Sequence, residues 1–272
     1  MAIGLLAGLT FAVGIWRGMD TDLILHRFYR ERQTLARLQH PHIARLLDGG
    51  TTGEGMPYIV MEYVKGVRIT DYCREKRLGI PERLALFLDV CDAVEYAHRQ
   101  FVVHRDLKPG NILVDEAGAV KLLDFGICKL LRTGGEETRD TSAGLMTPEY
   151  ACPEQIRGEA ITIASDVYSL AAVLYELLTG AKPHGIEEYT PREIDRAICE
   201  EEIVRPSQRA EDKGAARALE GDLDTILLFA MQKDPNRRYG TMGEFAEDIR
   251  RHLLHLPVRA RPDTVTYRVG KF

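Results

Sequence analysis

Two short polar segments in the middle of the chain constrain its fold more than any other feature. Residues 104–111 read HRDLKPGN, and the triplet DFG follows at 124–126. Between them lie two apolar runs separated by the turn residues Glu-Ala-Gly, and this pattern predicts a β-hairpin over 112–123. We therefore expect the two segments to flank one hairpin and to bring their acidic and amide side chains to a single site.

The remaining pattern divides the chain into a small mixed front part and a larger helical rear part. In the front part, apolar periodicity predicts a helix over 20–38 and short strands over 44–47 and 58–63. The glycine-rich segment 48–53 between those strands is predicted to be a turn. In the rear part, the same periodicity predicts long helices at 81–99, 164–179, 191–200, 221–232 and 241–254.

Together these elements predict an α+β fold of two lobes that meet at a hinge near residues 62–66. Lobes that meet at a hinge form a cleft, which is a usual place for a small ligand. We expect an atypical apolar segment at 1–19, followed by a partial small lobe at 20–64. A large lobe at 65–255 and a tail at 256–272 complete the chain.

Composition narrows the function classes. The 272 residues carry a net charge of -5, from 36 basic and 41 acidic side chains, which argues against a dedicated nucleic-acid binder. The five cysteines are scattered and form no CxxC pair, so reduced thiols are favoured over a disulfide framework or a zinc site. These features predict a cytoplasmic protein, with membrane association of a full-length relative as the alternative.

The first residues form an unusual apolar segment, in which Arg17 is the first charged side chain. The segment is shorter than the roughly 20 apolar residues that a membrane-spanning helix needs, and it lacks the basic start of a secretory signal. We interpret it as strand or coil packed on the fold. Contact with a membrane or a partner is one alternative, and disorder or an arbitrary start of the sequence is another.

The segments at 104–111 and 124–126 resemble the catalytic loop and the metal-binding triplet of protein kinases. The resemblance runs from about residue 20 to about residue 254. It is strongest to bacterial-type serine/threonine kinases of the eukaryotic-like superfamily, which share the pattern LLDGGTT seen at 46–52. It implies a two-lobed protein-kinase fold, ATP and Mg²⁺ as cofactors, and serine or threonine hydroxyls of a protein substrate as acceptors.

The resemblance also implies the roles of the central polar residues. Asp106 would accept the hydroxyl proton and align the acceptor, and Lys108 would steady the γ-phosphate. Asn111 and Asp124 would hold Mg²⁺ through hard oxygen ligands, which this ion prefers. The lysine segment of the loop is similar to that of serine/threonine kinases rather than tyrosine kinases.

A second group of residues resembles the kinase hinge and the front helix. The backbone of Glu62 and Val64 would hydrogen-bond adenine, and Met61 would guard the rear of that pocket. Glu31 matches the helix glutamate that pairs with an ATP-binding lysine in the family. The sequence pattern HPHI follows at 40–43, at the family spacing.

Further matches are structural or regulatory. Thr147 stands where serine/threonine kinases place a threonine that contacts the catalytic aspartate and lysine. Glu154 is expected to pair with Arg238, and Asp166 to brace the catalytic loop from below. Arg105 would bind a phosphate on the activation segment, for which the candidate phosphorylation sites are Thr133, Thr138, Thr141 and Ser142.

The front of the chain departs from the family pattern. It contains no GxGxxG loop, and no lysine occurs before Lys65; the lysine expected from the spacing falls near Val13, and Arg17 is a poorly placed substitute. Because phosphoryl transfer depends on positioning, we expect weak or no transfer. Three readings follow: a serine/threonine kinase with a truncated or diverged front lobe, a pseudokinase that acts as a binding module or scaffold, or an inactive fragment.

Overall fold

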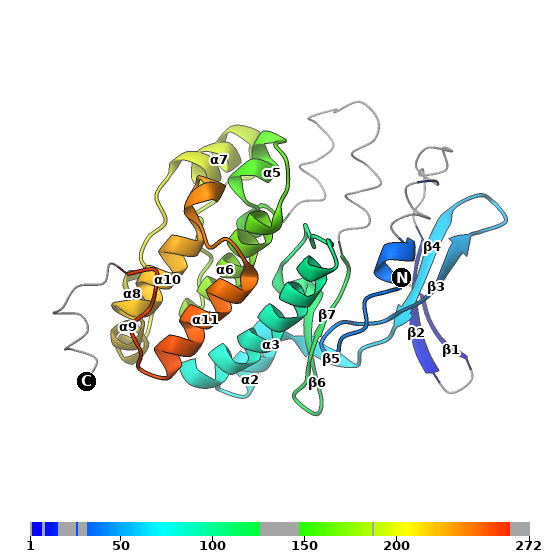
Figure 1. Cartoon of the computed structure of the whole chain (residues 1–272), viewed down its shortest axis with the longest axis horizontal. Coiled ribbons are helices and arrows are strands. Elements are labelled where there is room, and N and C mark those ends of the chain that lie inside the picture. The colour runs from blue at the N-terminus through cyan, green and yellow to red at the C-terminus, as the bar shows by residue number, and fades with distance from the viewer. Residues whose placement is uncertain are drawn as a thin grey trace.

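The computed structural model describes residues 2–6, 9–15, 26, 32–125, 147–186 and 188–261. It has a sheet at one end, a group of helices at the other and a β-hairpin between them (Figure 1). This is the two-lobed α+β arrangement that the sequence predicts. Glu31 and the four candidate phosphorylation sites lie outside the described residues.

The small lobe is a four-stranded antiparallel sheet. Its order is β1 (Ala2–Leu6), β2 (Leu9–Ile15), β4 (Pro57–Glu62) and β3 (Leu46–Thr51). The apolar start of the chain therefore forms two strands of this sheet, in agreement with the strand interpretation.

The prediction of a turn over 48–53 is wrong, because β3 continues through the two glycines of that segment. A Cβ atom on Gly49 would come within 2.8 Å of Arg32 Cδ, and one on Gly50 within 3.1 Å of Tyr58 Oη. The glycines thus allow neighbouring side chains to pack directly on the strand backbone. The turn itself comes after the strand, where Gly55 has a φ of 80° and donates to the carbonyl of Thr52.

The helix predicted over 20–38 is described only in part. Residues 32–35 are helical, and a turn at 36–37 ends the helix before the predicted boundary. Leu35 and Leu38 are buried in the core, as the apolar periodicity predicts.

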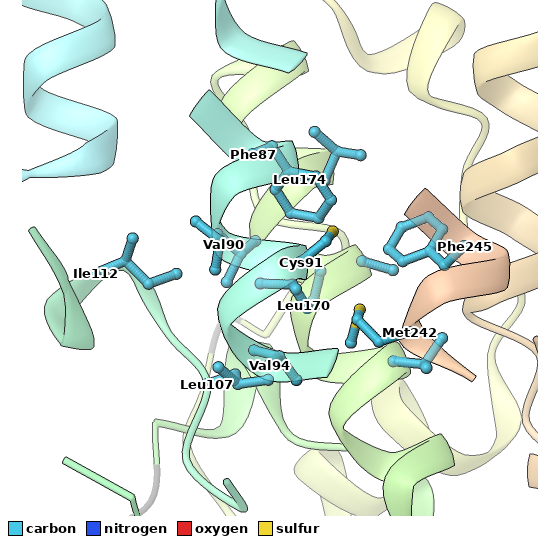
Figure 2. Close-up of a cluster of buried hydrophobic side chains, with 14 of the residues drawn as sticks. Phe87, Val90, Cys91, Val94, Leu107, Ile112, Leu170, Leu174, Met242 and Phe245 are labelled. Atoms are coloured by element: carbon cyan, nitrogen blue, oxygen red, sulfur yellow. The ribbon is translucent and has the colours of Figure 1, made fainter. Parts of the chain in front are cut away.

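Three long helices form the core of the large lobe: α3 (Ile80–Arg99), α6 (Ile163–Thr179) and α11 (Met242–Leu253). Their apolar side chains meet in one cluster, in which α3 lies between the hairpin and α11 (Figure 2). The ring of Phe87 on α3 contacts that of Phe245 on α11 edge to face, with ring centroids 5.7 Å apart. The helix α10 (Asp222–Ala230) packs on α6 and α11. All four helices agree with the predicted positions to within two residues.

The sequence did not predict the short helices. These are α2 (Ile69–Glu75), α5 (Pro153–Arg157), α8 (Pro206–Arg209) and α9 (Lys213–Leu219). None exceeds two turns, so periodicity has too few residues to reveal them. The helix predicted over 191–200 consists of α7 (Pro191–Asp195) followed by a π-helical turn, Arg196–Glu200. In the described part of the chain, no helix is both long and apolar enough to span a bilayer.

The predicted hairpin is present and joins the lobes. Its strands are β6 (Ile112–Asp115) and β7 (Val120–Leu122), and β5 (Gly66–Arg68) pairs with the outer edge of β6. Leu122 donates to the carbonyl of His42 at 2.8 Å and accepts from the N–H of Ala44 at 3.0 Å. The segment that follows the front helix is therefore fixed to the strand that leads to Asp124.

The C-terminal end of α3 contains a strained residue. Val102 donates to the carbonyl of Ala97 at 3.0 Å and Phe101 to that of His98 at 2.9 Å, which is the Schellman pattern of a helix end. Phe101 has a φ of 61° at the position where this pattern favours glycine, and its surface is 97% exposed. A left-handed backbone costs such a residue roughly 1–2 kcal/mol, and no burial of the ring offsets this cost.

We predict that Phe101→Gly raises the free energy of unfolding by about 1 kcal/mol, because glycine adopts this conformation without steric cost. The measurement is urea denaturation, with Phe101→Ala as the control that removes the ring but keeps Cβ. If the glycine variant is no more stable than the alanine variant, the strain assigned to this helix end does not exist.

Candidate active site

The three predicted catalytic side chains lie together in the loop before the hairpin. Lys108 Nζ is 2.9 Å from Asp106 Oδ2. Asn111 Nδ2 donates to the same oxygen at 3.1 Å and to the carbonyl of Asp106 at 2.8 Å. The carboxylate of Asp106 is thus oriented by a cation and an amide from its own loop.

Asp124 is connected to this loop through the backbone. It directly follows β7 and Leu123, and the N–H of Leu123 donates to the carbonyl of Asn111 at 2.8 Å. His104 Nε2 lies 2.9 Å from the Leu123 carbonyl, and the ring of Phe125 packs on His104 with centroids 4.6 Å apart. These contacts bring the predicted catalytic and metal-binding segments to one end of the hairpin.

Among the described residues, burial outweighs the nearby positive charges at the carboxyl group of Asp124. Although part of the residue is exposed, desolvation of its carboxyl group raises its pKa, and the nearby charge of Asp106 adds to this effect. His104 and Lys108 act in the opposite direction but do not cancel it. A bound cation would remove this electrostatic cost.

The donor set fits Mg²⁺. Asn111 uses its Nδ2 on Asp106, so its amide oxygen is the atom left for a cation, and the carboxylate of Asp124 supplies further oxygen. In the described residues, no three His, Cys, Asp or Glu side chains form a metal-binding group. Mg²⁺ is usually held by one or two carboxylates together with water and substrate phosphates.

A buried carboxylate supports the catalytic loop from below. Asp166, which is 1% exposed, accepts hydrogen bonds from the N–H groups of His104 at 2.7 Å and Arg105 at 2.9 Å. His98 Nε2 lies 2.8 Å from the same carboxylate. In the structure, Asp166 thus holds the two residues directly before Asp106.

Glu154 and Arg238 form a buried ion pair in the structure. Arg238 donates to both oxygens of Glu154, at 2.7 and 2.9 Å, and its other N–H groups reach the carbonyls of Gln232, Lys233 and Ala164. Burial raises the pKa of Glu154, but the hydrogen bonds and charge of Arg238 outweigh burial and leave that pKa below its usual value. The pair ties α5 to the segment after α10.

The predicted hinge residues lie at the end of β4. Met61 packs against the core, and the Glu62 carboxylate is 3.1 Å from Lys121 Nζ on β7. Among the described residues, the N–H of Val64 takes part in no hydrogen bond. This amide is therefore available to a ligand, whereas the side chain of Glu62 contacts Lys121 of the hairpin and accepts from the N–H of Arg45.

One expected contact is not made and one residue was missed. In the described part of the chain, no hydrogen bond joins Thr147 to Asp106 or Lys108, and the Asp106 carboxylate contacts Lys108 and Asn111. Gln155, which the sequence analysis did not single out, donates from Nε2 to the carbonyl of Arg105 at 2.7 Å. Its place three residues after the N-cap Cys152, where glutamine often caps a helix, is the signal that could have identified it.

Comparison with known proteins identifies the class. The family profile described as Protein kinase domain matches residues 13–253. The chain therefore belongs to the protein kinase domain family.

Its relatives point to the serine/threonine kinases of bacteria. "Serine/threonine-protein kinase PknB" of Mycobacterium tuberculosis is 38% identical over 227 residues, which cover 82% of this chain and 35% of the relative. "Probable serine/threonine-protein kinase CE0033" of Corynebacterium efficiens is 37% identical over 257 residues, covering 91% of this chain and 38% of the relative. The chain thus spans little more than a third of the length of these relatives.

Solved structures share the fold. The kinase domain of Mycobacterium tuberculosis PknI, solved as a point mutant, superposes with a TM-score of 0.65 and 26% identity, covering 90% of this chain and 85% of that one. Rad53 residues 1–466 in complex with AMP-PNP superpose with a TM-score of 0.63 and 27% identity, covering 88% of this chain and 57% of that one. The two-lobed kinase fold is confirmed.

We predict that Arg238→Met lowers the free energy of unfolding by roughly 3–5 kcal/mol, because it leaves the buried charge of Glu154 without a partner. Urea denaturation measures the effect. The double variant Glu154→Gln/Arg238→Met removes both charges, so its loss should be smaller than the sum of the two single losses. Simple additivity would contradict the pairing energy assigned here.

We predict opposite effects of Asp124→Asn with and without ligand. Because the folded-state pKa of Asp124 is raised, its contribution to stability is full below the usual carboxyl pKa and is lost as pH rises through the folded-state value. Without metal at pH 7, the variant should therefore melt at the same temperature as wild type or higher. With Mg²⁺ and an ATP analogue, only wild type should be stabilised, by about 2.7 kcal/mol at 100 times Kd.

Thermal unfolding across a pH series, with and without the ligand, tests this prediction. The difference in melting temperature between Asp124→Asn and wild type should shrink toward low pH, where Asp124 of wild type is protonated. An Asn variant that is less stable than wild type in the absence of metal would contradict the desolvated charge assigned to Asp124.

Proposed function

We propose that this domain binds Mg²⁺ and ATP and transfers the γ-phosphoryl group to serine or threonine hydroxyls of a protein. The observation that carries the proposal is the convergence of Asp106, Lys108, Asn111 and Asp124 at one end of the hairpin. The names of the relatives support serine and threonine hydroxyls as the phosphoryl acceptors. The complex of Rad53 with AMP-PNP supports ATP as the nucleotide.

In this proposal each residue of the site has one task. Asp106 accepts a hydrogen bond from the substrate hydroxyl and receives its proton, while Lys108 offsets negative charge on the phosphoryl group in transit. Asn111 and Asp124 hold the metal ion, which when bound neutralises charge on the ATP phosphates. The free N–H of Val64 would donate to the adenine ring beside Met61.

The small lobe limits the expected activity. The first 64 residues contain no lysine, so the ion pair that places the α- and β-phosphates in kinases is not available from this part of the sequence. We therefore propose slow transfer for the chain as given. A scaffold that binds nucleotide without transfer is the second candidate, and this missing cation favours it.

The strand register indicates where such a lysine would work. In the ladder between β2 and β4, Gly14 is paired with Ile59 and Val13 with Val60. Directly paired residues share a face of the sheet, and Ile59 is buried toward the core while Val60 is only half-buried. Position 14 thus lies on the inner face of the sheet. Position 13, near which the family spacing places the expected lysine, lies on the outer face.

Transfer of radiolabelled phosphate from ATP to a serine/threonine protein substrate tests the proposal. Wild type should show slow turnover that Asp106→Asn abolishes. Gly14→Lys should raise the rate, by up to about 100-fold, because it restores a positioning contact, and the matched variant Val13→Lys should not. Label transfer that persists in Asp106→Asn would refute the assigned site.

The same preparations separate a kinase from a scaffold. Stabilisation by Mg²⁺ and ATP without any transfer, even in Gly14→Lys, would support the scaffold. Absence of both stabilisation and transfer would contradict each of the two functions.

A further inference from the structure

The peptide group directly before Asp106 is held on both sides by side chains. Its carbonyl, that of Arg105, accepts a hydrogen bond of 2.7 Å from Gln155 Nε2. Its N–H, that of Asp106, donates to His104 Nδ1 at 3.3 Å. The orientation of this peptide plane determines the direction in which the Asp106 side chain leaves the backbone.

This part of the loop needs external support. Arg105 has a φ of 69°, a left-handed conformation that costs a residue with a side chain roughly 1–2 kcal/mol. Such a conformation persists only where the surroundings impose it. Asp166 holds the N–H of Arg105 at 2.9 Å, and Gln155 holds the carbonyl on the side of Asp106.

The amide of Gln155 is committed at both ends. Its Oε1 accepts from the N–H of Cys152, the N-cap of α5, at 3.3 Å, in the manner of a capping box. With the oxygen bound there, Nε2 is directed to the carbonyl of Arg105. A carboxylate at this position could still cap the helix, but it would present an acceptor to the Arg105 carbonyl in place of a donor.

We propose that Gln155 is a positioning residue for Asp106, which couples the docking of α5 to the orientation of the catalytic carboxylate. The contacts of that carboxylate with Lys108 and Asn111 are 2.9 and 3.1 Å long, so a rotated peptide plane would disrupt them. The inference rests on the proposed role of Asp106. It concerns the placement of the carboxylate and leaves nucleotide binding unaffected.

The test compares wild type with two variants. Gln155→Glu keeps an acceptor for the N–H of Cys152 but loses the donor to the Arg105 carbonyl. Gln155→Met is uncharged and loses both hydrogen bonds. Glu159→Gln is the control, because Glu159 is an exposed residue just beyond α5. Both Gln155 variants should lower kcat for a serine/threonine peptide about 10- to 100-fold, since small misplacement of a reacting group has effects of this size. KM for the peptide and Kd for a Mg²⁺–ATP analogue should stay at the wild-type values.

Amide hydrogen exchange at Asp106 provides a readout that needs no turnover. It should become faster in both Gln155 variants and remain unchanged in Glu159→Gln. If wild type has no activity but exchange accelerates in the variants, the proposed function fails and the positioning role stands. Unchanged exchange at Asp106, a kcat loss in Gln155→Glu alone, or a loss shared with nucleotide affinity would each overturn the inference.

Discussion

The geometry of the site depends first on the buried carboxylate of Asp166. A charged group that is 1% exposed is costly unless it is hydrogen-bonded, and here the N–H groups of His104 and Arg105 and the ring of His98 supply the partners. Asp166 lies in the first turn of α6, a helix with most of its residues in the core. The loop that carries Asp106 therefore takes its position from a helix in the buried core of the large lobe.

Two further connections extend this support to the rest of the site. The Leu123–Asn111 hydrogen bond places Asp124 beside the catalytic loop, and the pairing of Leu122 with His42 and Ala44 attaches the small lobe to the same strand. On the opposite side, the Glu154–Arg238 pair fixes α5, from which Gln155 reaches Arg105. The site is thus a junction of three elements that are distant in sequence, and each is held by buried polar contacts.

The sequence predicted the parts of this site that local patterns encode. The hairpin, the long helices and the grouping of Asp106, Asn111 and Asp124 followed from periodicity and from two short polar segments. Gly49 and Gly50 were misread as a turn, because the side chains of Arg32 and Tyr58 that lie over them come from other parts of the chain. Gln155 was missed for a similar reason, since its partner is 50 residues away. The inner position 14, rather than 13, emerged only from strand register.

The most direct test of the central claim is to locate the metal ion. Anomalous diffraction from a crystal grown with Mn²⁺ in place of Mg²⁺ and an ATP analogue would show its position. The account predicts a peak within ligand distance of an Asp124 carboxylate oxygen and the Asn111 amide oxygen, with the γ-phosphate near Asp106 and Lys108. Bound nucleotide with the metal away from both Asn111 and Asp124 would contradict it.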